Sequence, residues 1–248
     1  MNSILITGAS SAIGKNLIKQ IDRKNQTILA HYNKSNEFIN FLKKNKFKSK
    51  IIPLKCDFFI KKDINKFIKK IKNYKLDTIL HLASKRIEVK RFNKLKIEDF
   101  NNEINLSFHS IFEILKISLP NMLKEKKGKV VFVLSSGTYG LPSAYLSHYI
   151  CMKYMLLGLM KSLSAEYKGR GINFNAISPS MMDTPFIKNL DQKFVDLNKY
   201  LSPTKSFIKI DTVISKIKFL LSTKSDNIHG TNIILTDNTS FNFSSVSF

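Results

Sequence analysis

Strand-like and helix-like patterns alternate along this chain of 248 residues, and no other feature restricts its fold as much. Short apolar runs typical of buried strands are each followed by a stretch with helical spacing. The strand candidates are residues 3–7, 26–32, 50–55, 78–82, 129–135 and 172–178. Such alternation favours a parallel sheet with helices on both faces. We therefore predict an α/β fold, a doubly wound parallel sheet forming a single domain over residues 1–248.

The helical stretches carry the one-sided apolar spacing that this fold requires. Apolar side chains recur at helical intervals, with lysines between them, at Ile64, Phe67, Ile68 and Ile71. We expect this helix to cover one sheet face, and we expect two further helices before Gly128 and after Ser147.

A glycine-containing turn joins the first predicted strand to the helical run at residues 15–21. Gly8 permits a tight turn, small Ala12 allows close backbone approach, and Gly14 lets the helix pack against the strand. The free N–H groups at such a helix start suit a pyrophosphate. An ordinary strand-to-helix turn would carry the same pattern.

Three polar residues indicate a proton-transfer site. Tyr149 and Lys153 are four residues apart, so they share one face if the segment is helical. A neighbouring ammonium would favour the phenolate and make the tyrosine a useful acid or base. Ser136, thirteen residues upstream of Tyr149, would hold the substrate oxygen. Tyr145 has no lysine four positions on, and His148, the neighbour of Tyr149, is interpreted as a packing or rim residue.

With both signals in one chain, the sequence resembles the short-chain dehydrogenase/reductase family, and especially its 3-oxoacyl-carrier-protein reductase-like branch. The resemblance covers nearly the whole chain and implies a Rossmann-like sheet. It also implies a catalytic set of Asn105, Ser136, Tyr149 and Lys153. In that set the asparagine supports a water that links the lysine to solvent.

The same resemblance implies where a dinucleotide would bind. Cys56 and Asp57 match the pair that flanks the adenine, and Thr184 matches the polar contact to the nicotinamide amide. The implied cofactor contacts are Gly8, Ser10, Ser11, Ile13, Gly14, Asn33, Lys34, Ser35, Asp57, Ala83, Tyr149, Lys153, Pro179, Met182 and Thr184.

The end of the second strand bears on the choice of cofactor. An acid there would bind the ribose hydroxyl and repel a 2′-phosphate, but residues 27–32 are followed by Asn33, Lys34 and Ser35. An amide, a cation and a hydroxyl suit a phosphate, so we predict NADP(H) over NAD(H). Alternatively, this segment is a polar helix start in which Asn33 or Ser35 serves as the cap.

The chain departs from the family pattern at several turns. His81-Leu82-Ala83-Ser84 stands where Asn-Asn-Ala-Gly is usual, which removes the side-chain bonds of the first asparagine and the backbone freedom of the glycine. Residues 11, 12 and 180 also differ. Residues 230–238 resemble the last strand of the family, but the usual Asp-Gly-Gly ending is missing. These changes motivate an alternative: a non-catalytic dinucleotide-binding sensor or assembly protein.

The formal net charge of +23 invites a nucleic-acid interpretation, but only four of the 41 basic residues are arginine and no nucleic-acid motif accompanies them. We expect no specific nucleic-acid partner. A more specific use would be docking of an acidic carrier protein through Lys85, Arg86, Lys90 and Arg91.

The remaining expectations concern the setting of the enzyme. Two cysteines are too few for a metal cluster, and we expect no metal, no secretory leader, no membrane span and a cytoplasmic location. The resemblance implies a homodimer or homotetramer. Residues 186–207 would form a mobile substrate lid or a static surface helix, and residues 87–92, 137–146 and 186–200 would form the pocket walls.

These expectations combine into one function. We predict NADPH-dependent reduction of a substrate carbonyl to an alcohol, with Ser136 orienting the carbonyl oxygen and Tyr149 donating the proton. The substrate would be a 3-oxoacyl thioester, or alternatively a sugar or another small ketone.

Overall fold

A seven-stranded parallel sheet forms the centre of the molecule. A computed structural model describes residues 2–188, 190–202 and 205–236. The sheet order is β3-β2-β1-β4-β5-β6-β7. Its strands are β1 (Asn2–Thr7), β2 (Gln26–Tyr32), β3 (Lys50–Lys55), β4 (Leu76–His81), β5 (Gly128–Val133), β6 (Ile172–Pro179) and β7 (Asn232–Leu235). This order confirms the predicted doubly wound, Rossmann-like α/β fold.

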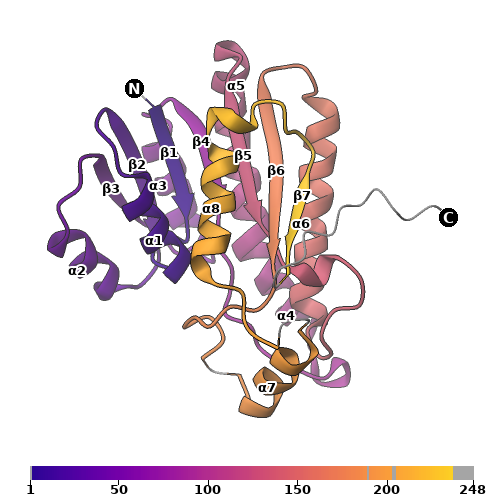
Figure 1. The fold of residues 1–248 in the computed structure, drawn as a ribbon. Helices are drawn as coiled ribbons and strands as arrows, with labels where there is room; N and C mark the ends of the chain where they lie inside the picture. The colour runs from indigo at the N-terminus through magenta and orange to yellow at the C-terminus, as the bar shows by residue number, and fades with distance from the viewer. Residues whose placement is uncertain (1, 189, 203–204, 237–248) are drawn as a thin grey trace.

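Helices cover both faces of this sheet (Figure 1). They are α1 (Ala12–Ile21), α2 (Asn36–Lys44), α3 (Lys61–Ile71), α4 (Ile97–Glu103), α5 (Ser110–Glu125), α6 (Ser147–Glu166), α7 (Gln192–Leu201) and α8 (Ile210–Leu221). A π-helical segment, η2 (Ile104–His109), joins α4 to α5, and short 3-10 turns are η1 (Phe92–Lys94), η3 (Ser136–Thr138) and η4 (Thr223–Ser225). In Figure 1, α1 and α8 lie in front of the sheet and α3, α5 and α6 lie behind it.

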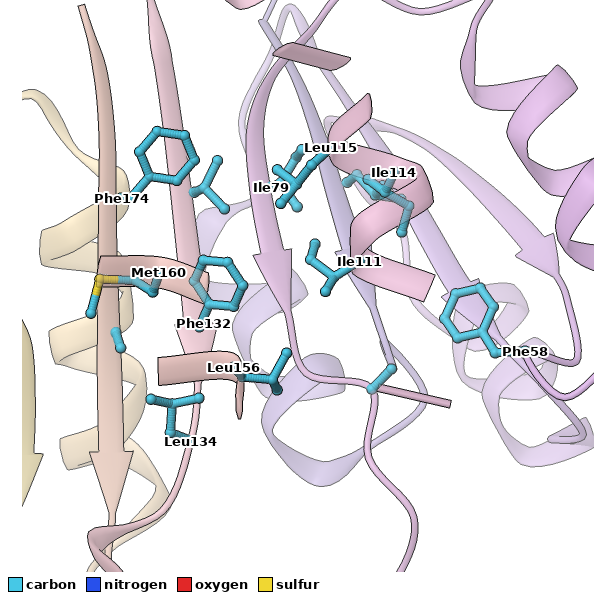
Figure 2. Close-up of a cluster of buried hydrophobic side chains, with 14 of the residues drawn as sticks. Phe58, Ile79, Ile111, Ile114, Leu115, Phe132, Leu134, Leu156, Met160 and Phe174 are labelled. Carbon is cyan, nitrogen blue, oxygen red and sulfur yellow. The ribbon is translucent and has the colours of Figure 1, made fainter. Parts of the chain in front are cut away.

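Each face of the sheet carries its own apolar core. On one side Leu17 of α1 and Ile214 of α8 pack against Ile4, Ile6 and other side chains of the central strands. On the other side α3, α5 and α6 supply the partners. Figure 2 shows part of this second core, with Phe132 of β5 beside Leu156 and Met160 of α6.

Burial of these side chains is the main source of stability. Leu5, Leu29 and Ile79 come from three neighbouring strands, and all three are fully buried. Burying one such side chain contributes roughly 1.5–3 kcal/mol. The predicted strands and helices are present, and their boundaries differ from the prediction by a few residues. Asp237 and Asn238 of the predicted last strand lie outside the described residues.

The segment predicted as a lid contains α7 in its described part. Asp191 caps this helix by accepting hydrogen bonds from the N–H groups of Lys193 (2.8 Å) and Phe194 (3.3 Å). In Figure 1, α7 lies below the carboxyl ends of the strands, where the active site is expected. Within the residues the structure describes, none of the helices has the combination of length and hydropathy needed to cross a membrane.

Candidate active site

The predicted site residues gather where the strands end. In a parallel sheet with this order, the crevice for a ligand opens at the carboxyl ends beside β1 and β4, where the chain switches direction. Gly8 follows β1, Ala83 follows β4, and Ser136 follows β5. Segments far apart in the sequence therefore meet at one edge of the sheet.

The glycine turn after β1 is a close-packed cradle. Gly8 has φ of +67°, and a Cβ on it would come within 3.0 Å of the Ala83 nitrogen. A Cβ on Gly14 would come within 2.5 Å of the Ala9 carbonyl oxygen. Ser11 caps α1 by accepting a hydrogen bond from the Gly14 N–H at 3.1 Å. The two glycines therefore allow this turn and the start of α1 to pack closely against their own backbone neighbours.

A buried histidine that the sequence analysis missed anchors this turn. His31 of β2 accepts a hydrogen bond from the Gly8 N–H on Nδ1 at 3.0 Å, and its Nε2 lies 3.1 Å from the Cys56 carbonyl oxygen. Because a carbonyl can only accept, Nε2 must carry the proton and the ring is neutral. Burial lowers the pKa of His31 to about 4, which is consistent with this tautomer.

The altered segment after β4 keeps side-chain bonds of its own. Thr7 Oγ1 accepts hydrogen bonds from the N–H groups of Leu82 (3.1 Å) and Ala83 (3.2 Å), so its hydroxyl donates to His81 Nδ1 at 2.9 Å. The expected loss of the asparagine bonds is thus offset by a histidine that ties β4 to β1. Ser84 does not have positive φ, so the freedom of the missing glycine is not used here.

The structure brings Tyr149 and Lys153 together on the buried face of α6. Tyr149 is 5% exposed and Lys153 is 3% exposed. The Lys153 Nζ atom lies 5.4 Å from the centroid of the tyrosine ring and donates a hydrogen bond to the Val133 carbonyl at 3.1 Å. A buried ammonium next to a buried phenol is the arrangement that the i, i+4 spacing predicts.

Ser135, not named in the sequence analysis, is the serine whose side chain lowers the pKa of Tyr149. Its hydroxyl also accepts from the Gly137 N–H at 3.2 Å and caps the short η3 turn. Ser136 follows it at the start of that turn, is half-buried, and remains a prediction as the substrate-orienting residue. Spacing along the chain does not indicate which of the two adjacent serines acts on Tyr149.

Asn105 lies in the π-helical segment η2, half-buried beside the buried Ser107. A π-helical turn widens the helix and often marks a functional site. Two residues before it, at the end of α4, stands Glu103, which is 1% exposed and which the sequence analysis did not single out.

Burial dominates the ionisation of these groups in the free protein. It raises the pKa of Tyr149, while the hydrogen bond from Ser135 lowers it. Burial lowers the pKa of Lys153 to about 8, and the carboxylate of Glu103 opposes this change. Lys153 is not among the groups that lower the pKa of Tyr149, contrary to the expectation from their spacing, and burial dominates, so Tyr149 is protonated at neutral pH and available as a donor.

At the end of β2, Lys34 is exposed and Asn33 is half-buried. Ser35 caps α2 by accepting a hydrogen bond from the Phe38 N–H at 3.1 Å, as the alternative interpretation of this segment holds. Glu37, in the first turn of α2, is paired with Lys15 of α1.

The other predicted cofactor contacts line the same edge. Asp57 accepts a hydrogen bond from the Phe59 N–H at 3.0 Å, and Thr184 accepts one from the Phe186 N–H at 3.3 Å. Ser10, Ile13 and Met182 are half-buried, and Ala83 and Pro179 are buried. In the part of the chain that the structure describes, no cluster of histidine, cysteine and carboxylate side chains could hold a metal ion.

The three segments predicted as pocket walls meet around this site. The Lys90 N–H donates to the Tyr145 carbonyl at 2.9 Å, which joins the first wall to the second. The Ser143 hydroxyl donates to Asn198 of α7, which joins the second wall to the third. A pocket of about 720 Å³ opens between residues 85–90 and residues 190–191.

Comparison with known proteins identifies a matching protein family and similar reductases. A protein-family model described as short chain dehydrogenase matches residues 2–194. The 3-oxoacyl-[acyl-carrier-protein] reductase of Buchnera aphidicola is 29% identical over 230 residues, which cover 91% of this chain and 92% of that protein. The corresponding reductase of Thermotoga maritima is 28% identical over 234 residues, with 91% and 92% covered.

A solved structure agrees in fold. The 3-oxoacyl-[acyl-carrier protein] reductase from Brucella melitensis superposes with a TM-score of 0.80 at 20% identity, and the match covers 94% of this chain and 89% of that one. At this identity the likeness concerns the fold alone.

Proposed function

The chain belongs to the short-chain dehydrogenase family and is an oxidoreductase, and we propose that it reduces a substrate carbonyl to an alcohol with NADPH. One observation carries the proposal: a buried tyrosine and a buried lysine lie on one face of α6, at the edge of the sheet where the glycine cradle opens. A phenol held protonated beside an ammonium is suited to give a proton to a developing alkoxide.

Each residue of the site would have a distinct task. The nicotinamide, when bound, supplies the hydride. Ser136 would hold the carbonyl oxygen, and Tyr149 would donate its proton to that oxygen. Lys153 would stabilise the phenolate left behind, since a positive charge nearby favours the anion. Asn105 would hold a water that returns the proton to this set.

Gly8 and Gly14 would suit a dinucleotide site because they allow the tight turn and the close helix–strand packing that such a site needs. The free N–H groups of α1 and its helix dipole would hold the pyrophosphate. The buried hydrogen bonds of Thr7, His31 and His81 support the cradle, as either a reductase or a non-catalytic dinucleotide-binding protein would require.

Replacing Tyr149 with phenylalanine tests the reaction. The variant Tyr149→Phe lacks the proton donor but keeps the ring, so we expect turnover of a reducible carbonyl to fall by about 10²–10⁴-fold. Fluorescence titration should give an unchanged affinity for NADPH. A variant with the turnover of the original protein would contradict the assigned role.

The preference for NADPH is argued from charge at the end of β2. Lys34 is exposed there, and Glu37, two residues after Ser35, is paired with Lys15. The Ser35 hydroxyl already caps α2, so the main contacts to the 2′-phosphate would come from Asn33 and Lys34.

Titration with NADPH and NADH side by side tests this preference. We expect tighter binding of NADPH, and we expect Lys34→Glu to weaken NADPH binding by roughly tenfold or more while NADH binding changes little. Lys24→Glu, the same change on an exposed loop before β2, is the control. Equal affinities for the two dinucleotides would refute the preference.

We further propose a 3-oxoacyl thioester as substrate, carried on an acidic protein, because the relatives in Buchnera and Thermotoga are named as reductases of that class. Of the four basic residues near the pocket, Lys85 is paired with Glu88 at 2.9 Å and Lys90 with Asp99 at 2.6 Å. Arg86 and Arg91 would therefore attract the carrier, and a free sugar or small ketone is the alternative substrate.

Charge reversal separates these substrates. The double variant Arg86→Glu/Arg91→Glu should raise KM for a carrier-linked substrate and leave a free ketone unaffected. Lys69→Glu/Lys70→Glu, at the far end of α3, makes the same change of charge away from the site. Equal effects of the two double variants would refute docking.

The proposal also covers the oligomeric state and the cellular location of the protein. Exposed apolar side chains on α5 and α6, such as Phe112 and Tyr154, support a homodimer or homotetramer, which sedimentation velocity would measure. Both cysteines are free thiols, and this supports a reducing compartment such as the cytoplasm.

A further inference from the structure

Polar side chains join the η3 turn, which carries Ser136, to the next two strands of the sheet. The Thr138 hydroxyl at the end of η3 donates to the Ser135 carbonyl at 2.8 Å and lies 3.3 Å from the hydroxyl oxygen of Ser178 in β6. Ser178 donates to Asn232 Oδ1 of β7 at 2.8 Å. Thr138 and Ser178 are both buried. The reaction proposed above uses none of these three hydrogen-bonding side chains.

These side chains connect β5 to β6 beyond the point where the paired backbones of the two strands end. The paired register reaches Val133 and Ile177, and one further bond joins the Leu134 N–H to the Ile177 carbonyl at 2.8 Å. The chain after β5 then enters η3, while β6 continues beside β7. The contact between Thr138 and Ser178 therefore extends the connection where the backbone no longer supplies it.

The η3 turn also packs closely against the helix that carries the proton donor. A Cβ on Gly137 would come within 2.5 Å of the Cδ1 atom of Ile150 in α6. Ile150 is the neighbour of Tyr149 in the sequence. The turn is thus in contact with α6 through Gly137 and with β6 through the next residue, Thr138.

Ser178 stands directly before the segment expected to hold the nicotinamide. Pro179, the first predicted contact of that segment, is paired with Leu235 of β7, and the Ser180 N–H donates to the Leu235 carbonyl at 2.8 Å. The start of this segment is therefore fixed to β7, as Ser178 is through Asn232. One short stretch of β6 holds both the serine turn and the start of the nicotinamide segment.

We propose that Thr138 and Ser178 are positioning residues that fix Ser136 relative to the nicotinamide segment. This inference rests on the proposed reductase function. A carbonyl held by Ser136 must face the nicotinamide at a set distance and direction for the hydride to pass. Contacts between hydroxyls restrict both distance and angle, whereas an apolar contact of the same size is not directional. Loss of either hydroxyl should therefore slow hydride transfer without weakening the binding of the dinucleotide.

The variant Ser178→Ala tests the proposal. We expect kcat for carbonyl reduction to fall by roughly tenfold, because a small misplacement of the carbonyl slows the chemical step, while KM for NADPH stays the same. With NADPH deuterated at the transferred position, the isotope effect on kcat should persist or increase, since hydride transfer is the step that slows. Ser118→Ala removes another buried hydroxyl, one that bonds within α5, and should keep the original kcat.

Variants of Thr138 test the other half of the link. Thr138→Val keeps the shape of the side chain but lacks the hydroxyl, so kcat should again fall by roughly tenfold. Thr138→Ser keeps the hydroxyl and should retain most of the original kcat. Because the two hydroxyls form one link, the double variant Thr138→Val/Ser178→Ala should be little slower than either single variant. The Thr138 variants also decide the matter if Ser178→Ala fails to fold.

The outcomes separate this inference from the reductase function itself. If Ser178→Ala and Thr138→Val both reduce the carbonyl with the kcat of Ser118→Ala, the inference is wrong and the reductase function stands. The same conclusion follows if kcat falls while the isotope effect drops toward unity, because a step other than hydride transfer has then slowed. A protein that reduces no carbonyl with either dinucleotide would overturn the proposed function, and this inference with it.

Discussion

At the scale of single residues, this site depends on which of two adjacent hydroxyls faces the tyrosine. The Ser135 side chain lowers the pKa of Tyr149, whereas Ser136 begins the η3 turn that follows. The two would therefore have separate roles: Ser135 favours ionisation of Tyr149, and Ser136 holds the substrate oxygen. A hydrogen bond to an ionising group contributes about 1.5–3 kcal/mol.

Alanine variants of the two serines should behave differently. Ser136→Ala should lower kcat for carbonyl reduction by about 10²-fold, because the developing oxyanion loses a donor. Ser135→Ala should lower kcat less and should raise the pH at which Tyr149 ionises, as measured by ultraviolet difference spectroscopy. If Ser135→Ala proved the more damaging of the two while leaving the tyrosine titration unchanged, the division of roles would be wrong.

At the scale of elements, the strand–turn–helix unit of β1 and α1 binds through its backbone and so depends on empty space. The Cβ position of Gly14 falls 2.5 Å from the Ala9 carbonyl oxygen, which no side chain tolerates without a backbone shift. Gly158, in the middle of α6, has open space around its Cβ position. The same substitution therefore has opposite consequences in the two helices.

We expect Gly14→Ala to destabilise the protein by about 1–3 kcal/mol and to weaken dinucleotide binding, because α1 must move away from the turn. Gly158→Ala should stabilise it by up to about 1 kcal/mol, since alanine has the higher helix propensity. Thermal unfolding, with and without NADPH, measures both effects. Equal unfolding midpoints for the two variants would show that the turn is looser than the structure indicates.

At the scale of the whole molecule, stability should depend on pH through two histidines buried as neutral rings. Burial lowers the pKa of His31 to about 4 and that of His81 to about 3, from an ordinary value near 6.5. Between these values the unfolded chain binds protons that the folded protein excludes. The stability that the two neutral histidines contribute is therefore fully present above about pH 6.5 and is lost as the pH falls toward 4.

Each histidine contributes on the order of 3 kcal/mol to this loss. Urea unfolding at pH 7.5 and pH 5 should give a markedly lower free energy of unfolding at the acid pH. His81→Asn removes one titrating group and keeps a side chain that can bond Thr7, so its loss between the two pH values should be smaller. His109→Asn, at an exposed position, is the control, and an equal loss in both variants would contradict the assignment.

The sequence by itself determined the parallel sheet, the glycine cradle and the pairing of Tyr149 with Lys153. These features depend on local periodicity and on spacing along one helix, which the order of residues specifies directly. The tertiary structure alone decided that Ser135 acts on the pKa of Tyr149 and that His31 and His81 anchor the cradle. Those contacts join elements distant in the chain, so they depend on how the helices pack and which way each side chain points.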